Sequence, residues 1–75
     1  MKIIEAVLYT DNNVIRLETD KGKFYLDSKA KKFYDVHPVN VFAKEVDKDM
    51  AKTLLTAVSV ASYPNIKEVK QLLKS

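Results

Sequence analysis

The sequence of 75 residues contains a single histidine, the residue type that most often serves as a base near neutral pH. His37 precedes Pro38 at the end of an expected strand, and its nearest candidate partners along the chain are Ser28 and Asp35. Nucleophilic catalysis needs an activated serine, cysteine or lysine beside an oriented base, and the sequence has no Gly-x-Ser-x-Gly segment. We therefore expect no enzyme. A small enzyme centred on His37 is kept as a third hypothesis, which a fully exposed imidazole would remove.

The sequence contains few of the residues that cofactor-binding and metal sites need. Loops that bind phosphate require several glycines, and Gly22 is the only one in the chain. A structural zinc site needs four cysteine or histidine ligands, whereas the chain has no cysteine and one histidine. Glu45, Asp47 and Asp49 alternate like calcium ligands but lack the glycine and the distal glutamate of a calcium loop. We expect acids here to cap a helix, and we predict no cofactor and no metal.

Lysines and aromatic residues alternate between residues 20 and 35. Lysines neutralise phosphates and aromatic rings stack on bases, which is how many proteins bind single-stranded nucleic acid. Three aspartates lower the net charge of this region to +2. Binding of single-stranded nucleic acid is therefore the second hypothesis, and the alternative is a solvated hairpin whose lysines protect a sheet edge. The candidate residues are Lys21, Lys23, Tyr25, Lys29, Lys31, Lys32 and Tyr34.

Composition favours a small protein of the cytoplasm. The net charge of +3, from 13 basic and 10 acidic residues, is too mild to imply nucleic acid by itself. The absence of cysteine fits a reducing compartment. Glu5 interrupts the apolar start of the chain, so no signal peptide is expected. The longest uncharged run, residues 53–66, is too short to span a bilayer, and we predict no membrane partner.

Alternating apolar residues predict strands first and helices afterwards. The fold class that we predict is α+β, an antiparallel β-meander of three to five strands followed by two C-terminal α-helices on one sheet face, in a single domain over residues 1–75. Whether residues 32–46 form one strand or two is left open. The expected strands are residues 3–9, 14–19, 23–27, 32–36 and 39–46, and the expected helices run from Asp47 or Asp49 to about Ser62 and from Pro64 to about Lys74.

Side-chain parity sets the expected register of the sheet. A two-residue loop at Lys21-Gly22 would pair Leu17 with Leu26 and Arg16 with Asp27. A first turn of two or four residues, around residues 11–13, would place Leu8 on the same face as Ile15. In strand 3–9 we expect the even-numbered residues to face the core and the odd-numbered residues to form a mixed, partly apolar face.

The outer face of the first helix carries no charge after Lys52. A solvated helix face is normally charged, so we expect this one to be shielded, either by the last helix or by a second copy of the chain. The alternative is a solvated face that uses serine and threonine. A second candidate contact is the mixed sheet face. The interface candidates are Thr53, Thr56, Ser59 and Val60 on the helix, and Ile3, Val7 and Tyr9 on the sheet.

The first hypothesis is therefore a non-catalytic protein-interaction module that acts as a homodimer, with no more specific role assigned. The expected partner is a second copy of the chain, and another protein is the alternative. Pairing through the helix predicts that Ser59→Arg weakens assembly whereas Lys70→Ala does not. Exposure of Thr56, Ser59 and Val60 in a single copy would remove the argument for pairing through this helix.

Overall fold

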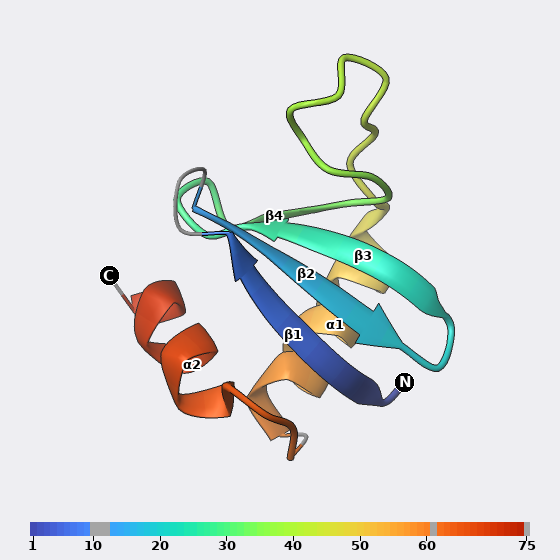
Figure 1. Cartoon of the computed structure of the whole chain (residues 1–75). Helices are drawn as coiled ribbons and strands as arrows, with labels where there is room; N and C mark the ends of the chain where they lie inside the picture. Colours follow the sequence, from blue (N-terminus) through green and yellow to red (C-terminus); the bar gives the residue numbers. More distant parts are fainter. Residues whose placement is uncertain (10–12, 61, 75) are drawn as a thin grey trace.

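A four-stranded antiparallel sheet and two helices make up the computed structural model, which describes residues 1–9, 13–60 and 62–74. The strands follow one another in space as β1-β2-β3-β4, and α1 crosses behind the sheet while α2 lies beside β1 (Figure 1). This arrangement confirms the predicted α+β meander followed by two helices. The elements are β1 (Ile3–Tyr9), β2 (Val14–Thr19), β3 (Gly22–Asp27), β4 (Lys32–Tyr34), α1 (Lys48–Val60) and α2 (Ile66–Lys74).

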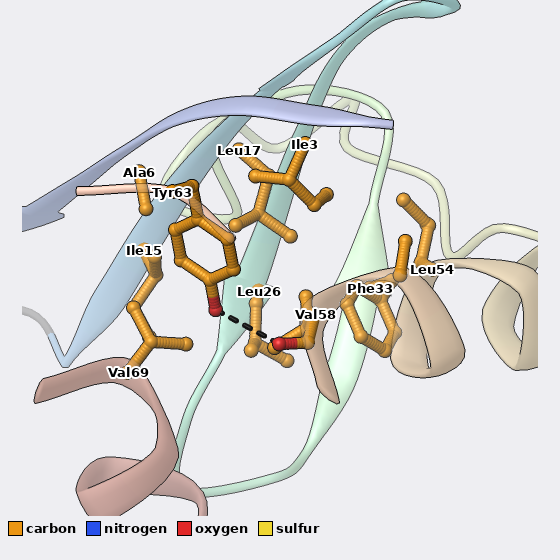
Figure 2. Close-up of a cluster of buried hydrophobic side chains, with 11 residues drawn as sticks. Ile3, Ala6, Ile15, Leu17, Leu26, Phe33, Leu54, Val58, Tyr63 and Val69 are labelled. Carbon is orange, nitrogen blue, oxygen red and sulfur yellow. Dashed lines mark hydrogen bonds between the residues drawn. The ribbon is translucent and has the colours of Figure 1, made fainter. Parts of the chain in front are cut away.

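The core lies between one sheet face and the two helices. All four strands and both helices contribute buried side chains to it (Figure 2). Full burial of one such aliphatic or aromatic side chain stabilises the fold by about 1.5–3 kcal/mol. The core residues are Ile3, Ala6, Ile15, Leu17, Leu26, Phe33, Leu54, Ala57, Val58, Tyr63 and Val69.

The connection between β1 and β2 confirms the predicted parity of these strands. Leu8 lies opposite Ile15 and Tyr9 lies opposite Val14, so four residues separate the last paired residues of the two strands. Asn13 has a φ of 55°, a conformation that asparagine adopts more readily than most residues. The predicted turn residues 11 and 12 lie outside the described residues.

The start of β1 departs from the predicted alternation. Ile3 pairs with Thr19 while Glu5 pairs with Glu18, so β1 carries one extra residue at this point. Ile3 is consequently buried in the core, and Ile4 is 57% exposed. The prediction for these two residues was wrong because a β-bulge reverses side-chain parity on one side of it.

The turn between β2 and β3 lies one residue earlier than predicted. Thr19 pairs with Gly22, so the two-residue loop is Asp20-Lys21. The hydroxyl of Thr19 donates to the Gly22 carbonyl (2.7 Å) and accepts from the Lys21 amide (3.0 Å), and Gly22 has a φ of 117°. A threonine that bonds the turn backbone therefore selects this loop.

The earlier turn changes the cross-strand partners but not the faces. Leu17 pairs with Phe24 instead of Leu26, and Arg16 pairs with Tyr25 instead of Asp27. The predicted Arg16–Asp27 pair was wrong. A register shift of two residues preserves parity, so Leu17 and Leu26 still both face the core.

Residues 32–46 form one short strand and a loop. β4 ends at Tyr34, and a single bridge joins Tyr34 to Glu45. The expected strand over residues 39–46 does not form. Instead the Asn40 amide donates to the His37 carbonyl (2.9 Å) and the Ala43 amide donates to the Asn40 carbonyl (3.0 Å). These consecutive turns fit Pro38 and Asn40, two residue types that favour turns over ladders.

The start of α1 follows the predicted cap, whereas the end of α1 and the start of α2 differ from the prediction by about two residues. A side-chain oxygen of Asp47 accepts a hydrogen bond from the Met50 amide (2.7 Å), which confirms Asp47 as the N-cap of α1. Helix α1 ends at Val60, and α2 begins at Ile66 rather than at Pro64. With 13 and 9 residues, the two described helices are too short and too polar to cross a membrane.

Candidate functional site

The outer face of α1 is open to solvent. Thr53, Thr56 and Ser59 are exposed, and Val60 is 77% exposed. The Thr53 hydroxyl donates to the Asp49 carbonyl one turn earlier, so this face satisfies a polar group within the helix itself. The expectation that neighbours shield the face on all sides was wrong for the single chain. The sequence-based argument for pairing through α1 is therefore withdrawn.

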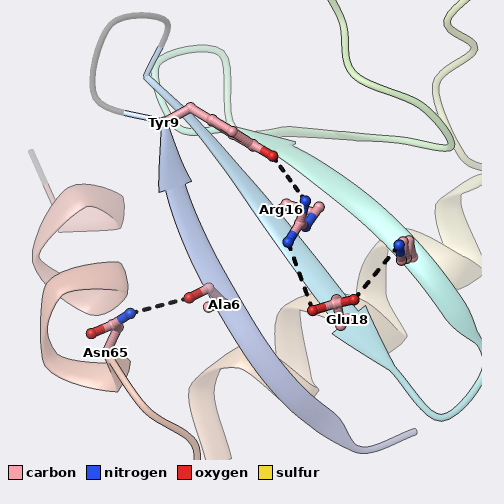
Figure 3. Close-up of polar contacts among 6 residues, drawn as sticks. Ala6, Tyr9, Arg16, Glu18 and Asn65 are labelled. Atoms are coloured by element: carbon pink, nitrogen blue, oxygen red, sulfur yellow. Dashed lines mark hydrogen bonds and ion pairs between the residues drawn. The ribbon is translucent and has the colours of Figure 1, made fainter.

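The chain turns at Tyr63 in a way that keeps α2 off this face. Tyr63 is 6% exposed, and its hydroxyl donates to the Val58 carbonyl at the end of α1 (3.0 Å; Figure 2). Just before α2, the Asn65 side-chain amide donates to the carbonyl of Ala6 on β1 (3.1 Å; Figure 3). These two bonds direct α2 toward β1, where Val69 enters the core. The outer face of α1 is left uncovered as a result.

The open sheet face carries a polar network. Arg16 donates to the Tyr9 hydroxyl (3.0 Å) and lies 3.8 Å from Glu18, which also pairs with Lys23 at 3.7 Å (Figure 3). A side-chain hydrogen bond with Glu18, together with its negative charge, raises the pKa of Glu5. The predicted contact residue Ile3 is in the core, and Val7 and Tyr9 are half-buried. Little of the mixed face is thus an apolar contact surface.

One end of this face is covered by the loop that follows β4. The ring of His37 lies 5.5 Å from that of Tyr9 and 5.7 Å from that of Tyr25, centroid to centroid. Val14, on the same side of the sheet as Tyr9 and Tyr25, is 3% exposed. His37 is accordingly half-buried between two tyrosines, with its Nδ1 accepting from the Val39 amide (3.1 Å).

The predicted partners of His37 are engaged elsewhere. The Ser28 hydroxyl donates to the Asn13 carbonyl (2.7 Å), and the Asp35 carboxylate accepts from the Lys44 amide (3.0 Å). Within the described residues, no group of three histidine, aspartate or glutamate side chains could hold a metal ion. The contacts of His37 are thus those of a residue that anchors a loop.

The lysines of the predicted nucleic-acid surface lie at two ends of the sheet. Lys21 is in the β2–β3 turn, whereas Lys29, Lys31 and Lys32 lie in or beside the β3–β4 turn. The six-residue strand β3 separates them by roughly 20 Å, at about 3.3 Å per residue. They do not form one continuous basic track.

Several of these candidate residues also have partners within the chain. Lys32 pairs with Glu45 at 3.6 Å, and the ammonium group of Lys31 donates to the Leu73 carbonyl. Tyr25 packs against His37 and lies opposite Tyr34 on the neighbouring strand, and both tyrosines are half-buried. Fewer rings and charges are available to a nucleic acid than the sequence predicts.

Among the described residues, three of the four most exposed large apolar side chains lie on the loop between β4 and α1, and the fourth is Val60 on α1. Val39, Val41 and Phe42 are 76%, 89% and 82% exposed, and we call them the apolar tip. The loop extends away from the sheet (Figure 1). Inside it, the Asn40 side chain accepts from the Phe42 amide (2.8 Å). Sequence reasoning missed this site because the apolar residues were assigned to a strand. The turn residues Pro38 and Asn40 were the available signal.

A groove of about 310 Å³ lies between β4, the first turns of α1 and the end of α2. Its walls are mostly apolar and its edge is basic, and we call it the lysine-rimmed groove. Leu55, 49% exposed, contributes part of the wall from α1. The apolar walls are Leu26, Phe33, Ala51, Leu55 and Leu73, and the charged rim is Lys31, Lys32, Lys52 and Glu45.

In comparisons with protein-family models, curated proteins and solved structures, the chain has no match. The class that the fold defines is a small α+β meander with two helices. Function has therefore to be argued from the surfaces described above.

Proposed function

We propose that the chain is a non-catalytic protein-interaction module that acts as a homodimer, with the apolar tip as its main contact. One observation carries this proposal. Three adjacent large apolar side chains, Val39, Val41 and Phe42, are each more than three quarters exposed on a loop with internal hydrogen bonds. Exposed apolar groups of this kind mark contact sites in soluble domains, because water exposure of each one is unfavourable.

The loop between β4 and α1 has hydrogen bonds and ring contacts within the single chain. Its turns bond the amides of Asn40, Phe42 and Ala43, and the His37 ring fixes its base against the sheet. Ordering a contact loop on binding has an entropic cost that weakens affinity, and a preformed loop avoids much of it. These contacts support a contact surface that is formed in the single chain.

A second copy of the chain is the partner that we favour. A domain of this size buries only about 60% of the surface of its unfolded chain, and such domains are often stabilised by association. The sequence contains no cysteine, so no disulfide can take that role. Two-fold dimers are also the commonest assemblies of soluble chains.

Sedimentation velocity between about 10 µM and 1 mM tests the proposal, since this range spans weak and moderate homodimer affinities. The wild-type chain should be dimeric at the upper end. The double variant Val41→Ser/Phe42→Ser should be monomeric, with an unchanged circular dichroism spectrum because both side chains are exposed.

Two matched controls separate the apolar tip from the surfaces predicted earlier. Ser59→Arg places a charge on the outer face of α1, and Lys70→Ala removes one from α2. Both variants should dimerise like the wild type. If Ser59→Arg dissociated the dimer, the contact would lie on α1 and not on the apolar tip. A wild-type chain that is monomeric at 1 mM would contradict the homodimer.

A further inference from the structure

We infer that the apolar tip of one copy occupies the lysine-rimmed groove of a second copy, and that the second copy does the same in return. This inference rests on the proposed homodimer and names the surface that receives the tip. Two separate observations support it, an exposed apolar projection and a groove with mostly apolar walls on the same chain.

The groove has the size and chemistry to receive an aromatic ring. Its volume of about 310 Å³ is at the lower end of sites that hold small molecules, which suits one ring better than a helix. Phe33, Leu55 and Leu73 supply apolar walls. A buried phenylalanine removes about 150–250 Å² from water, so Phe42, now 82% exposed, gains most from entering.

Charge favours the same pairing. Three lysines and one glutamate give the rim of the groove a net charge of +2. With Glu45 counted on the rim, the other residues of the loop and helix start between 35 and 49 hold three acidic and two basic side chains, for a net charge of −1. Lys52 has no carboxylate within ion-pair distance among the described residues. The acidic residues beside the incoming tip can therefore pair with Lys52 of the second copy. Opposite charges of this kind fix the orientation of partners at an interface.

The reciprocal arrangement follows from where the two surfaces lie. Glu45 is on the rim of the groove, and Phe42 is only three residues earlier in the chain, so tip and groove adjoin. Adjoining complementary surfaces can form a closed two-fold contact in which each copy gives a tip and receives one. A single tip is small beside the roughly 800 Å² that each partner buries in a standard interface. Two contacts together come closer to that area.

Complementation between two variants tests the inference. Phe42→Ser removes the tip and keeps the groove, whereas Leu55→Glu places a charge in the groove and keeps the tip. Both positions are exposed enough for the fold to tolerate the change. Each variant alone should be monomeric, because it retains no complete contact. An equimolar mixture should form a 1:1 heterodimer with one complete contact, at least about tenfold weaker than the wild-type dimer.

Two controls accompany the mixture. Val60→Glu adds the same charge to an exposed position of α1 outside the groove, and this variant alone should remain dimeric. The double variant Phe42→Ser/Leu55→Glu should form no complex with Phe42→Ser, because neither chain of that mixture has a tip.

The outcomes separate this inference from the proposed function. Monomeric variants that fail to complement would overturn the tip–groove pairing. A Leu55→Glu variant that stays dimeric would also overturn it and would leave the groove to a different occupant. Wild-type species larger than a dimer would overturn the reciprocal closure. A wild-type chain that is itself monomeric would contradict the homodimer proposed above.

Discussion

The ring of His37 meets that of Tyr9 edge-on, with an interplanar angle of 65° and 5.5 Å between centroids. This contact joins the loop after β4 to the far edge strand of the meander across the open sheet face. A second contact with Tyr25, at 5.7 Å, completes the anchor. The apolar tip begins two residues later in the chain, so the tyrosines determine how it is presented.

Replacing His37 with alanine should loosen the loop. Aromatic contacts of this kind contribute about 0.5–1.5 kcal/mol each beyond area burial. Hydrogen exchange at the amides of Phe42 and Ala43, which bond only within the loop, should become about tenfold faster or more, and self-association should weaken. His37→Phe keeps a ring in place, so its exchange rates and its self-association should stay close to those of the wild type. Unchanged exchange in His37→Ala would show that the loop is held by its own turns alone.

The Tyr63 hydroxyl should contribute to stability through its bond to the Val58 carbonyl. Tyr63→Phe keeps the buried ring but leaves this carbonyl without that donor. We expect the free energy of unfolding to fall by about 1 kcal/mol at neutral pH. Urea unfolding measures it. A variant as stable as the wild type would mean that another donor replaces the hydroxyl.

Tyr63 also predicts a loss of stability at alkaline pH. Burial raises the pKa of Tyr63, because the charged phenolate is disfavoured inside the protein. The unfolded chain therefore loses this proton first, and the stabilising contribution is complete below the unfolded pKa of about 10 and is lost above it. The stability advantage of the wild type over Tyr63→Phe should shrink between about pH 9 and pH 11.5. An advantage that is constant over this range would contradict the assignment.

The N-cap of α1 gives a prediction that is independent of assembly. Asp47→Ala removes the acceptor of the Met50 amide and should lower the free energy of unfolding by about 1 kcal/mol. Asp47→Ser should retain most of the stability. Asp49→Ala is the matched control, because Asp49 lies in the first turn and makes no side-chain cap bond among the described residues, so its loss should cost only about 0.3–0.5 kcal/mol through the helix dipole. Equal losses in the two alanine variants would argue against capping.

The order of elements could be predicted because local signals agreed with one another. Apolar parity correctly placed Leu8 and Ile15 on one face, and Asp47 was recognisable as a cap. The bulge that exchanges Ile3 and Ile4 could not be predicted, since both residues are equally apolar and either satisfies the core. Only the packing of the whole sheet distinguishes them.

The candidate site was less predictable than the fold. Val39 and Val41 are spaced as on one face of a strand, yet the described residues show no strand paired with them, and only the Tyr34–Glu45 bridge joins this segment to the sheet. Tertiary context therefore overrode a local pattern. The prediction that the charge-free face of α1 is shielded was also wrong. Thr53 and its neighbours are polar enough to face water without carrying a charge.

Disulfide trapping between single-cysteine variants tests the tip–groove pairing most directly, because the chain has no cysteine of its own. Phe42→Cys and Leu55→Cys would be mixed in a glutathione redox buffer, and covalent heterodimers would be counted by mass spectrometry. A disulfide requires Cα atoms about 4.4–6.8 Å apart, so only a tip seated in the groove permits it. We predict a rapid heterodimer with this pair and little with Phe42→Cys and Val60→Cys. Equal yields from both pairs, or no heterodimer from the first, would contradict the account.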